Sequence, residues 1–191
     1  MGKGNSKFDE LFAHLPPSPS THIIVIGLKN AGKSTIMRNM GLKSRLIKIP
    51  MEGMPILTVK SGRRVHITAW DIGGPQKLKS VWEHYFSVAQ GIMFVVDSSD
   101  TYSIREASQE FHLILNNKKL NNVPVMVVAN KQDQSDTLSI QDISTALRLC
   151  ELDRMWDIIA TSGKLGNGLY EAFHGLVDMI KTHKGGKCDT D

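Results

Sequence analysis

Long hydrophobic runs are missing from this 191-residue sequence, and cysteine is nearly absent. The longest apolar stretches, such as GIMFVV and VPVMVVA, fall far short of the roughly 18 residues that a membrane-spanning helix needs. The two cysteines, Cys150 and Cys188, show neither metal-binding nor redox spacing, and no secretory apolar segment stands at the start. We therefore expect a cytoplasmic protein with free thiols and no membrane span.

A strong excess of one charge is also absent. The net charge of +4 is spread along the chain, which is compatible with phosphate or lipid headgroups but not with the basic stripe of a nucleic-acid-binding protein. The seven histidines lack metal-ligand spacing, and no Ser/His/Asp pattern indicates a hydrolase of another type. We expect a monomer without a nucleic-acid partner.

Apolar runs with strand character alternate with helix-length segments that carry an apolar stripe. The strand-like runs are 22–26, 56–59, 65–70, 92–96, 125–129 and 157–160, and the helix-like segments are 34–40, 78–89, 104–115, 140–149 and 169–180. This alternation predicts a doubly wound α/β sheet with helices on both faces. Because SGRR is too short for a crossover, the second and third strands are expected to pair antiparallel in a six-stranded, mostly parallel sheet.

The domain organisation follows from the same pattern. Residues 1–20 form an N-terminal arm that ends in the linker PPSPS, residues 21–181 form one globular domain, and residues 182–191 form a polar tail.

The segment GLKNAGKS, residues 27–34, matches G-x-x-x-x-G-K-[ST] between a strand-like run and a helix-like one. Gly27 and Gly32 allow tight turns that aim backbone N–H groups at phosphate oxygens. Lys33 would contact the β- and γ-phosphates, and the Ser34 hydroxyl would bind Mg²⁺. A chance glycine-rich turn is the alternative, which the flanking elements disfavour. The remaining residues expected around the phosphates are Asn30, Ala31 and Thr35.

The tetrapeptide NKQD follows a strand-like run. A carboxylate such as Asp133 can accept two N–H bonds from guanine, whereas adenine lacks that donor pair. Asn130 would fix the loop, and the stem of Lys131 would cover the base. A polar turn is the common alternative for such a tetrapeptide taken singly. The tripeptide SGK after the last strand is a second candidate for base contacts, with a simple loop as the alternative; it consists of Ser162, Gly163 and Lys164.

Together with WDIGG, VWEHYF, FVVDSSD and GNGLYEAF, these motifs resemble those of the Arf and Arf-like small GTPases over nearly the whole chain. The resemblance implies a Ras-like G domain that binds GTP or GDP with Mg²⁺. It also implies that Asp71 supports the Mg²⁺ shell through water, that the Gly74 N–H contacts the γ-phosphate, and that the hairpin between the switch segments shifts register with the nucleotide. Met54, Trp70 and Tyr85 stand where the family presents an apolar patch to effectors, although core packing explains Trp70 equally well.

The sequence departs from the family pattern after its double glycine. Pro75 stands where the family has the glutamine that orients the attacking water, and proline offers neither an amide side chain nor a backbone N–H. This matters because phosphoryl transfer depends on positioning and electrostatics. We do not assign the role to the neighbouring Gln76, whose side chain starts one residue later. Alternatively, Pro75 rigidifies the loop while a partner supplies the catalytic groups.

Two further departures concern the phosphates. Met51 replaces the threonine that completes the Mg²⁺ shell, and a thioether is a poor ligand for a hard cation. Lys29 replaces the usual aspartate of the family and would either strengthen phosphate binding or obstruct a partner's arginine. We expect intact nucleotide binding with GTP hydrolysis that is slow or dependent on a partner.

The N-terminal sequence MGKGNSK carries an N-myristoylation signal on Gly2. One acyl chain binds membranes only marginally, with a constant of ~10⁴ M⁻¹, so a second signal is needed. An apolar stripe at helical spacing, together with Lys3 and Lys7, would supply it. In the family this arm packs on the body with GDP and moves to the membrane with GTP; a permanently docked arm is the alternative. The stripe consists of Phe8, Leu11, Phe12 and Leu15.

These observations favour an Arf-like switch, peripherally attached to membranes, that acts in vesicle traffic or organelle organisation with effectors, an exchange factor and a GTPase-activating protein. A pseudo-GTPase that recruits partners without hydrolysis is the first alternative. A P-loop ATPase or kinase is the second, and Asp133 disfavours it. The C-terminal CDTD does not match a prenylation signal, and DSSD at 97–100 is explained by a strand end followed by helix-capping residues.

Overall fold

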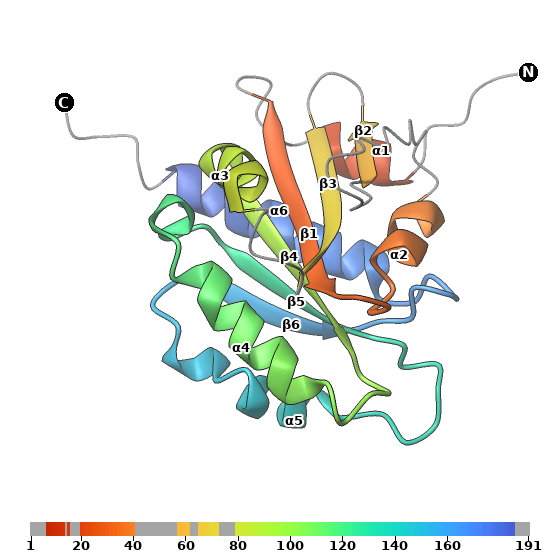
Figure 1. Ribbon diagram of the computed structural model, residues 1–191. Coiled ribbons are helices and arrows are strands. Elements are labelled where there is room, and N and C mark those ends of the chain that lie inside the picture. The colour runs from red at the N-terminus through yellow and green to blue at the C-terminus, as the bar shows by residue number, and fades with distance from the viewer. Residues whose placement is uncertain are drawn as a thin grey trace, which may run out of the picture.

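The computed structural model describes residues 7–13, 15, 20–40, 57–61, 65–72 and 79–185. In this part of the chain a twisted sheet lies between two layers of helices (Figure 1). The strands are β1 (Thr21–Leu28), β2 (Leu57–Ser61), β3 (Val65–Ile72), β4 (Gly91–Asp97), β5 (Val125–Asn130) and β6 (Trp156–Ala160). The helices are α1 (Lys7–Ala13), α2 (Lys33–Asn39), α3 (Lys79–Val88), α4 (Ile104–Leu115), α5 (Ile140–Ala146) and α6 (Leu169–Gly185), with 3-10 turns η2 (Lys118–Leu120) and η3 (Leu149–Glu151).

The sheet has the strand order β2-β3-β1-β4-β5-β6. Only β2 and β3 pair antiparallel; β3, β1, β4, β5 and β6 are parallel neighbours. The prediction of a six-stranded, mostly parallel sheet with one hairpin is therefore confirmed. Because the parallel strands end at the same edge, the loops that follow β1, β5 and β6 meet there.

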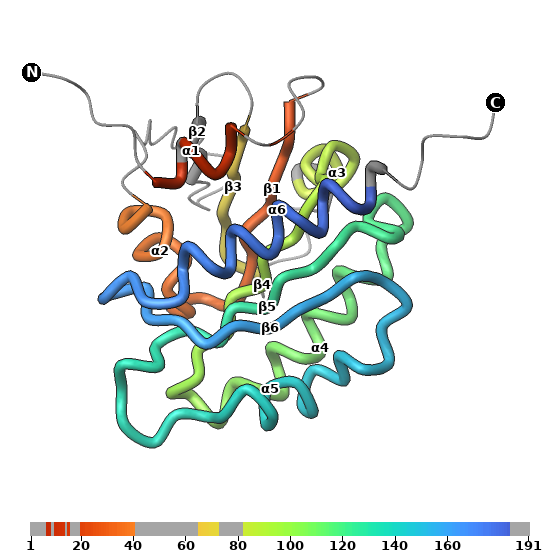
Figure 2. Tube along the Cα trace, turned by 180° about the vertical axis from the view of Figure 1, so that it is seen from behind, coloured from red at the N-terminus to blue at the C-terminus, as the bar shows by residue number. Residues whose placement is uncertain are grey.

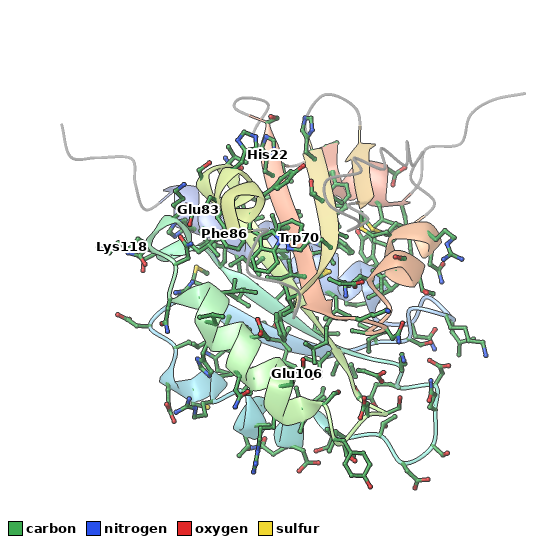
Figure 3. The ribbon with its side chains drawn as sticks, in the orientation of Figure 1. His22, Trp70, Glu83, Phe86, Glu106 and Lys118 are labelled. Atoms are coloured by element: carbon green, nitrogen blue, oxygen red, sulfur yellow. The ribbon has the colours of Figure 1, made fainter. Side chains whose placement is uncertain are left out.

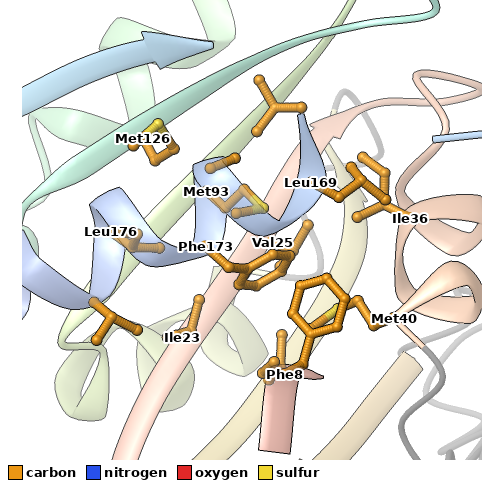
Figure 4. Packing of buried hydrophobic residues seen from close by; sticks show 14 of the residues in the cluster. Phe8, Ile23, Val25, Ile36, Met40, Met93, Met126, Leu169, Phe173 and Leu176 are labelled. Atoms are coloured by element: carbon orange, nitrogen blue, oxygen red, sulfur yellow. The ribbon is translucent and has the colours of Figure 1, made fainter. Parts of the chain in front are cut away.

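Helices α1, α2 and α6 cover one face of the sheet, as the view from behind shows (Figure 2). On this face Phe173 of α6 points at Val25 of β1, and Phe8 of α1 lies beside it (Figure 4). Helices α3, α4 and α5 cover the other face, where Phe111 of α4 packs on Phe94 of β4 at 4.7 Å between ring centroids. Burial on both faces explains why the central strands read as continuous apolar runs.

Two helices differ from their predicted ranges by more than one residue at an end. The segment expected to be helical over 140–149 breaks because Arg148 adopts a left-handed backbone with φ 49°, and η3 follows. This turn keeps both Leu147 and Leu149 fully buried. Helix α6 continues past the predicted 180 to Gly185, through the first residues assigned to the polar tail.

The apolar stripe of the N-terminal arm forms α1, which packs against the body. Phe8 and Phe12 are almost completely buried and meet the ring of Phe173 edge-on, at 5.7 and 5.9 Å between centroids. Leu11 and Leu15 are each 2% exposed. Helix α1 is thus docked in this structure, while Gly2 lies outside the described residues. In the described part of the chain, no helix combines the length and apolarity needed to cross a membrane.

Candidate nucleotide-binding site

The phosphate-loop motif connects β1 to α2 with an unusual backbone. Asn30 and Gly32 both have positive φ, at 67° and 101°. A Cβ on Gly32 would stand 2.2 Å from Asn130 Nδ2, and one on Gly27 would stand 2.2 Å from the carbonyl oxygen of Val95. Both glycines are therefore required by close approach, which brings the loop directly against β4 and the end of β5.

Lys33, the first residue of α2, is a buried cation with only 4% of its side chain exposed. Its Nζ donates to the carbonyl oxygens of Gly27 and Leu28 at 2.8 and 2.6 Å. It also pairs with Asp71 Oδ1 at 2.5 Å, and Asp71 lies opposite Gly27 in the pairing of β1 with β3. Burial lowers the pKa of Lys33, and the hydrogen bond and charge of Asp71 offset part of that shift. The lysine is held on the inner side of the loop with its charge compensated.

Asn130 joins three segments that are far apart in the sequence. Its side chain is 1% exposed, and Nδ2 donates to the carbonyl oxygen of Ala31 at 2.7 Å. Its Oδ1 accepts from the N–H of Gly163 at 2.7 Å and from Thr161 Oγ1 at 3.3 Å. One buried amide therefore connects the phosphate loop, the end of β5 and the loop after β6. Both the nitrogen and the oxygen of this buried amide have hydrogen-bond partners, which holds the three segments in one arrangement.

Asp133 and Ser162 form the next pair along this edge. The Ser162 hydroxyl donates to Asp133 Oδ1 at 2.6 Å and accepts from the N–H of Leu165 at 3.0 Å. The hydrogen bond from Ser162 lowers the pKa of Asp133, against a smaller opposing effect of desolvation. Asp133 is thus an exposed carboxylate that is ionised at neutral pH. The hydrogen bond from Ser162 to its Oδ1 orients it. Such a group can accept N–H donors from a ligand at the same edge.

The arrangement fits a guanine nucleotide. The phosphate loop with Lys33 lies at one end of the site, where phosphates would bind, and the carboxylate of Asp133 lies at the other, where the base would bind. The fit to Mg²⁺ is more modest. Ser34 is exposed, and the side chain of Asp71 is 34% exposed. Among the described residues no three His, Cys, Asp or Glu side chains converge. A Mg²⁺ ion here would depend on phosphate oxygens and water for most of its shell, which is the usual mode for this ion.

Lys29 lies at the tip of the phosphate loop and is exposed. It lines a cavity of about 240 Å³ between this loop, the end of β4 and the start of α4. The cavity also has Ile72 and Ala107 in its wall and Glu106 at its side. The effect of Lys29 on phosphate or partner binding stays a prediction.

Several predicted site residues lie outside the described part of the chain, so the structure does not place them. They are Gly2, Met51, Met54, Gly74, Pro75 and Gln76. Of the predicted effector patch, Trp70 is 2% exposed and lies in the core beside Phe86 (Figure 3). Its ring centroid is 5.4 Å from that of Tyr85 and 6.3 Å from that of Phe86. Tyr85 is half-buried. The structure thus places Trp70 in the core, and its role toward effectors stays a prediction.

Two contacts at the site had no assignment from the sequence. Asn39 at the end of α2 donates to the carbonyl oxygens of Gly163 and Lys164, at 3.0 and 3.2 Å. Asp97, taken only as a strand end, pairs with Lys131 at 2.5 Å. No local pattern signals the Asn39 contact because its partners are more than 120 residues away along the chain. The DSSD motif did carry a signal for Asp97, since it follows a strand that ends at the same edge.

The model of the ADP-ribosylation factor family matches residues 8–180 of the chain. The protein belongs to the ADP-ribosylation factor family. It is 35% identical over 186 residues to ADP-ribosylation factor-like protein 4A of Homo sapiens, a match that covers 94% of this chain and 93% of that protein. It is 34% identical over 172 residues to ADP-ribosylation factor-like protein 14 of Mus musculus, with 88% and 90% covered. Members of this family are small GTPases that in general bind guanine nucleotide and Mg²⁺.

Proposed function

We propose that this Arf-like protein binds GTP and GDP at the edge described above and works as a molecular switch. The observation that carries the proposal is the buried amide of Asn130, which holds the phosphate loop through Ala31 and the base loop through Gly163. A ligand that spans both loops needs a phosphate chain at one end and a planar group with N–H donors at the other. A guanine nucleotide has both.

Each residue has a defined task in this proposal. The backbone of the phosphate loop would hold the β- and γ-phosphates, and Lys33 would exchange its contact with Asp71 for one with these phosphates. Asp133 would accept the N–H donors of guanine. The remaining candidate contacts to the base are Asn130, Lys131, Ser162, Gly163 and Lys164, and those around the phosphates are Gly27, Asn30, Ala31, Gly32, Ser34, Thr35 and Gly74. Bound Mg²⁺ would neutralise phosphate charge, with Ser34 as a ligand and Asp71 as a support through water.

Hydrolysis is the step that we propose to be weak. Pro75 cannot orient a water molecule with an amide, and Met51 cannot donate a hard ligand to Mg²⁺. The nucleotide would then stay as GTP until a partner supplies the missing groups or exchanges it. The proposal also includes attachment to membranes through a myristoylated Gly2 and the apolar face of α1, with effectors and regulators of membrane traffic as partners.

The nucleotide proposal is tested by binding of a fluorescent GDP to the purified protein with and without Mg²⁺. We expect tight, Mg²⁺-dependent binding that excess GTP competes and excess ATP does not. Asp133→Asn should weaken GDP binding and shift preference toward xanthine nucleotides, because an amide donates one N–H to the xanthine oxygen that replaces the guanine amino group. Binding of ATP in preference to GTP would contradict the assignment.

The hydrolysis proposal needs a separate single-turnover assay. The protein is loaded with GTP and Mg²⁺, and bound GTP and GDP are followed by chromatography over hours. We expect less GDP than the intrinsic rate of ~10⁻⁴ s⁻¹ typical of small GTPases would produce. Pro75→Gln should raise the rate. If the wild type hydrolyses at the ordinary rate, the proline is tolerated.

If nucleotide binds but effectors bind equally with GTP and GDP, the protein is a pseudo-GTPase.

A further inference from the structure

The carboxylate at the end of β4 has two sets of partners, and the local turn at Ser99 accounts for only one. Asp97 Oδ1 accepts from the backbone N–H and the hydroxyl of Ser99, at 3.0 and 2.6 Å. Its other oxygen, Oδ2, accepts from Lys131 Nζ at 2.5 Å. The side chains of Asp97 and Lys131 are 15% and 26% exposed. This is a partly buried, charge-assisted contact, a class that is stronger than an exposed surface ion pair.

Sheet register brings the two residues together. Asp97 lies opposite Asn130 in the parallel pair of β4 and β5, so the residue after Asn130 starts beside the carboxylate. Lys131 has a positive φ of 68°, a conformation that is costly for a residue with a Cβ. The backbone of Lys131 makes a left-handed turn at the end of β5, and the tip of its side chain is held by Asp97 at the end of β4.

This restraint has a consequence for binding. A free lysine side chain has many rotamers and loses that freedom when it packs over a ligand. A stem that is already ordered loses less, so the ligand binds more tightly and leaves more slowly. Asp133, the carboxylate that would read guanine, lies two residues beyond Lys131 in the same loop.

The charge state of Asp97 is compatible with this contact at neutral pH. Burial alone raises the pKa of its carboxyl, but hydrogen bonds from Lys131 and Ser99 outweigh that effect and leave the pKa below its ordinary value. Asp97 is therefore ionised at neutral pH, and the pair with Lys131 does not depend on a proton.

We propose that Asp97 is a positioning residue for the guanine nucleotide, which holds the stem of Lys131 over the base and thereby slows nucleotide release. The proposal rests on guanine-nucleotide binding as proposed above. Asp97 itself touches no part of the nucleotide; it acts through the lysine.

The test measures release of fluorescent GDP from the full-length protein with Mg²⁺, after excess unlabelled GDP is added. Asp97→Asn keeps the shape and an acceptor for Ser99 but removes the charge. We expect release to accelerate roughly fivefold to tenfold, the cost of ordering one long side chain on binding. The matched control is Glu83→Gln on α3, which breaks the 2.6 Å pair with Lys119 of η2. Glu83 lies near Lys118 in Figure 3, away from the candidate site, and its substitution should leave the rate unchanged. Melting curves verify that both variants fold.

A double-mutant cycle separates positioning from a general structural role. Lys131→Met retains an apolar stem without the amine, and in that background Asp97→Asn should have no further effect. Equal acceleration in both backgrounds would overturn the proposal, because Asp97 would then act through Ser99 or the strand end. If the wild type binds GDP and Asp97→Asn releases it at the same rate as the wild type, the inference is overturned while the proposed function stands. A wild type that binds no guanine nucleotide would remove the proposed function and this inference together.

Discussion

Gly32 shows at the scale of one residue why the phosphate loop tolerates so little change. Its φ of 101° is strained for any residue with a Cβ, and the added atom would stand 2.2 Å from Asn130 Nδ2. We predict that Gly32→Ala lowers the free energy of unfolding by about 2–4 kcal/mol, the sum of the backbone strain and a broken buried hydrogen bond. Urea denaturation followed by circular dichroism measures the change.

Gly166 provides the matched control for this prediction. It has a similar φ of 86°, but a Cβ there would stand 3.4 Å from Asn39 Oδ1, an ordinary contact. Gly166→Ala should therefore show the backbone strain alone, about 1–2 kcal/mol. Equal losses for the two variants would mean that the contact with Asn130 contributes nothing measurable to the stability of the loop.

At the scale of an element, α1 combines a short helix with an apolar face that the body covers. Phe12 is 1% exposed and packs edge-on against Phe173 of α6. We predict that Phe12→Ala costs about 3–5 kcal/mol of stability if α1 stays docked in solution, because a large ring leaves a cavity behind. Thermal or urea unfolding of the purified protein measures this loss.

Glu10 is the control on the same helix, because it is exposed. Glu10→Ala should change the unfolding free energy by less than about 0.5 kcal/mol. If Phe12→Ala is as mild as Glu10→Ala, α1 does not stay docked in solution. That result would favour an arm whose apolar face is free for a membrane.

At the scale of the whole molecule, the central strands lie between two hydrophobic clusters. On β1, Ile23 and Val25 face one cluster while Ile24 and Ile26 face the other, and all are at most 1% exposed. Strand β6 has a neighbour on one side only and a partly exposed surface. We predict that amides of β1, β4 and β5 exchange with solvent most slowly, through global unfolding, and that amides of β6 exchange earlier. Hydrogen exchange followed by NMR measures this order, and equal protection of β5 and β6 would contradict it.

Much of this architecture follows from local sequence patterns. Strand β5, buried on both faces, reads as an uninterrupted apolar run, and the helix expected at 104–115 has those bounds in the structure. The helix expected at 140–149 was too long because burial of Leu147 and Leu149 decides the backbone at Arg148. A stripe of apolar residues does not reveal where tertiary packing ends a helix.

The residues of the candidate site were likewise predicted only in part from the sequence. The residue types at Gly27, Gly32, Lys33 and Asp133 were recognisable because phosphate and guanine chemistry demands them in a short, local order. The role of Asp97 was not recognised, because DSSD was taken as a strand end followed by helix-capping residues. That interpretation was wrong in its second half, since the N-cap of α4 is Ser103. The contact with Lys131 adds a second partner that only the pairing of β4 with β5 provides.

By itself, the sequence determined the order of strands and helices, the glycine-rich turn, and the family to which the chain belongs. The tertiary structure decided which distant groups touch: Asn130 with Ala31 and Gly163, Asp97 with Lys131, and α1 with α6. The physical reason is that backbone preferences and hydrophobic periodicity act over a few residues. A hydrogen bond between loops separated by about a hundred residues depends on the register of a whole sheet, and the sheet forms only when both of its faces are covered.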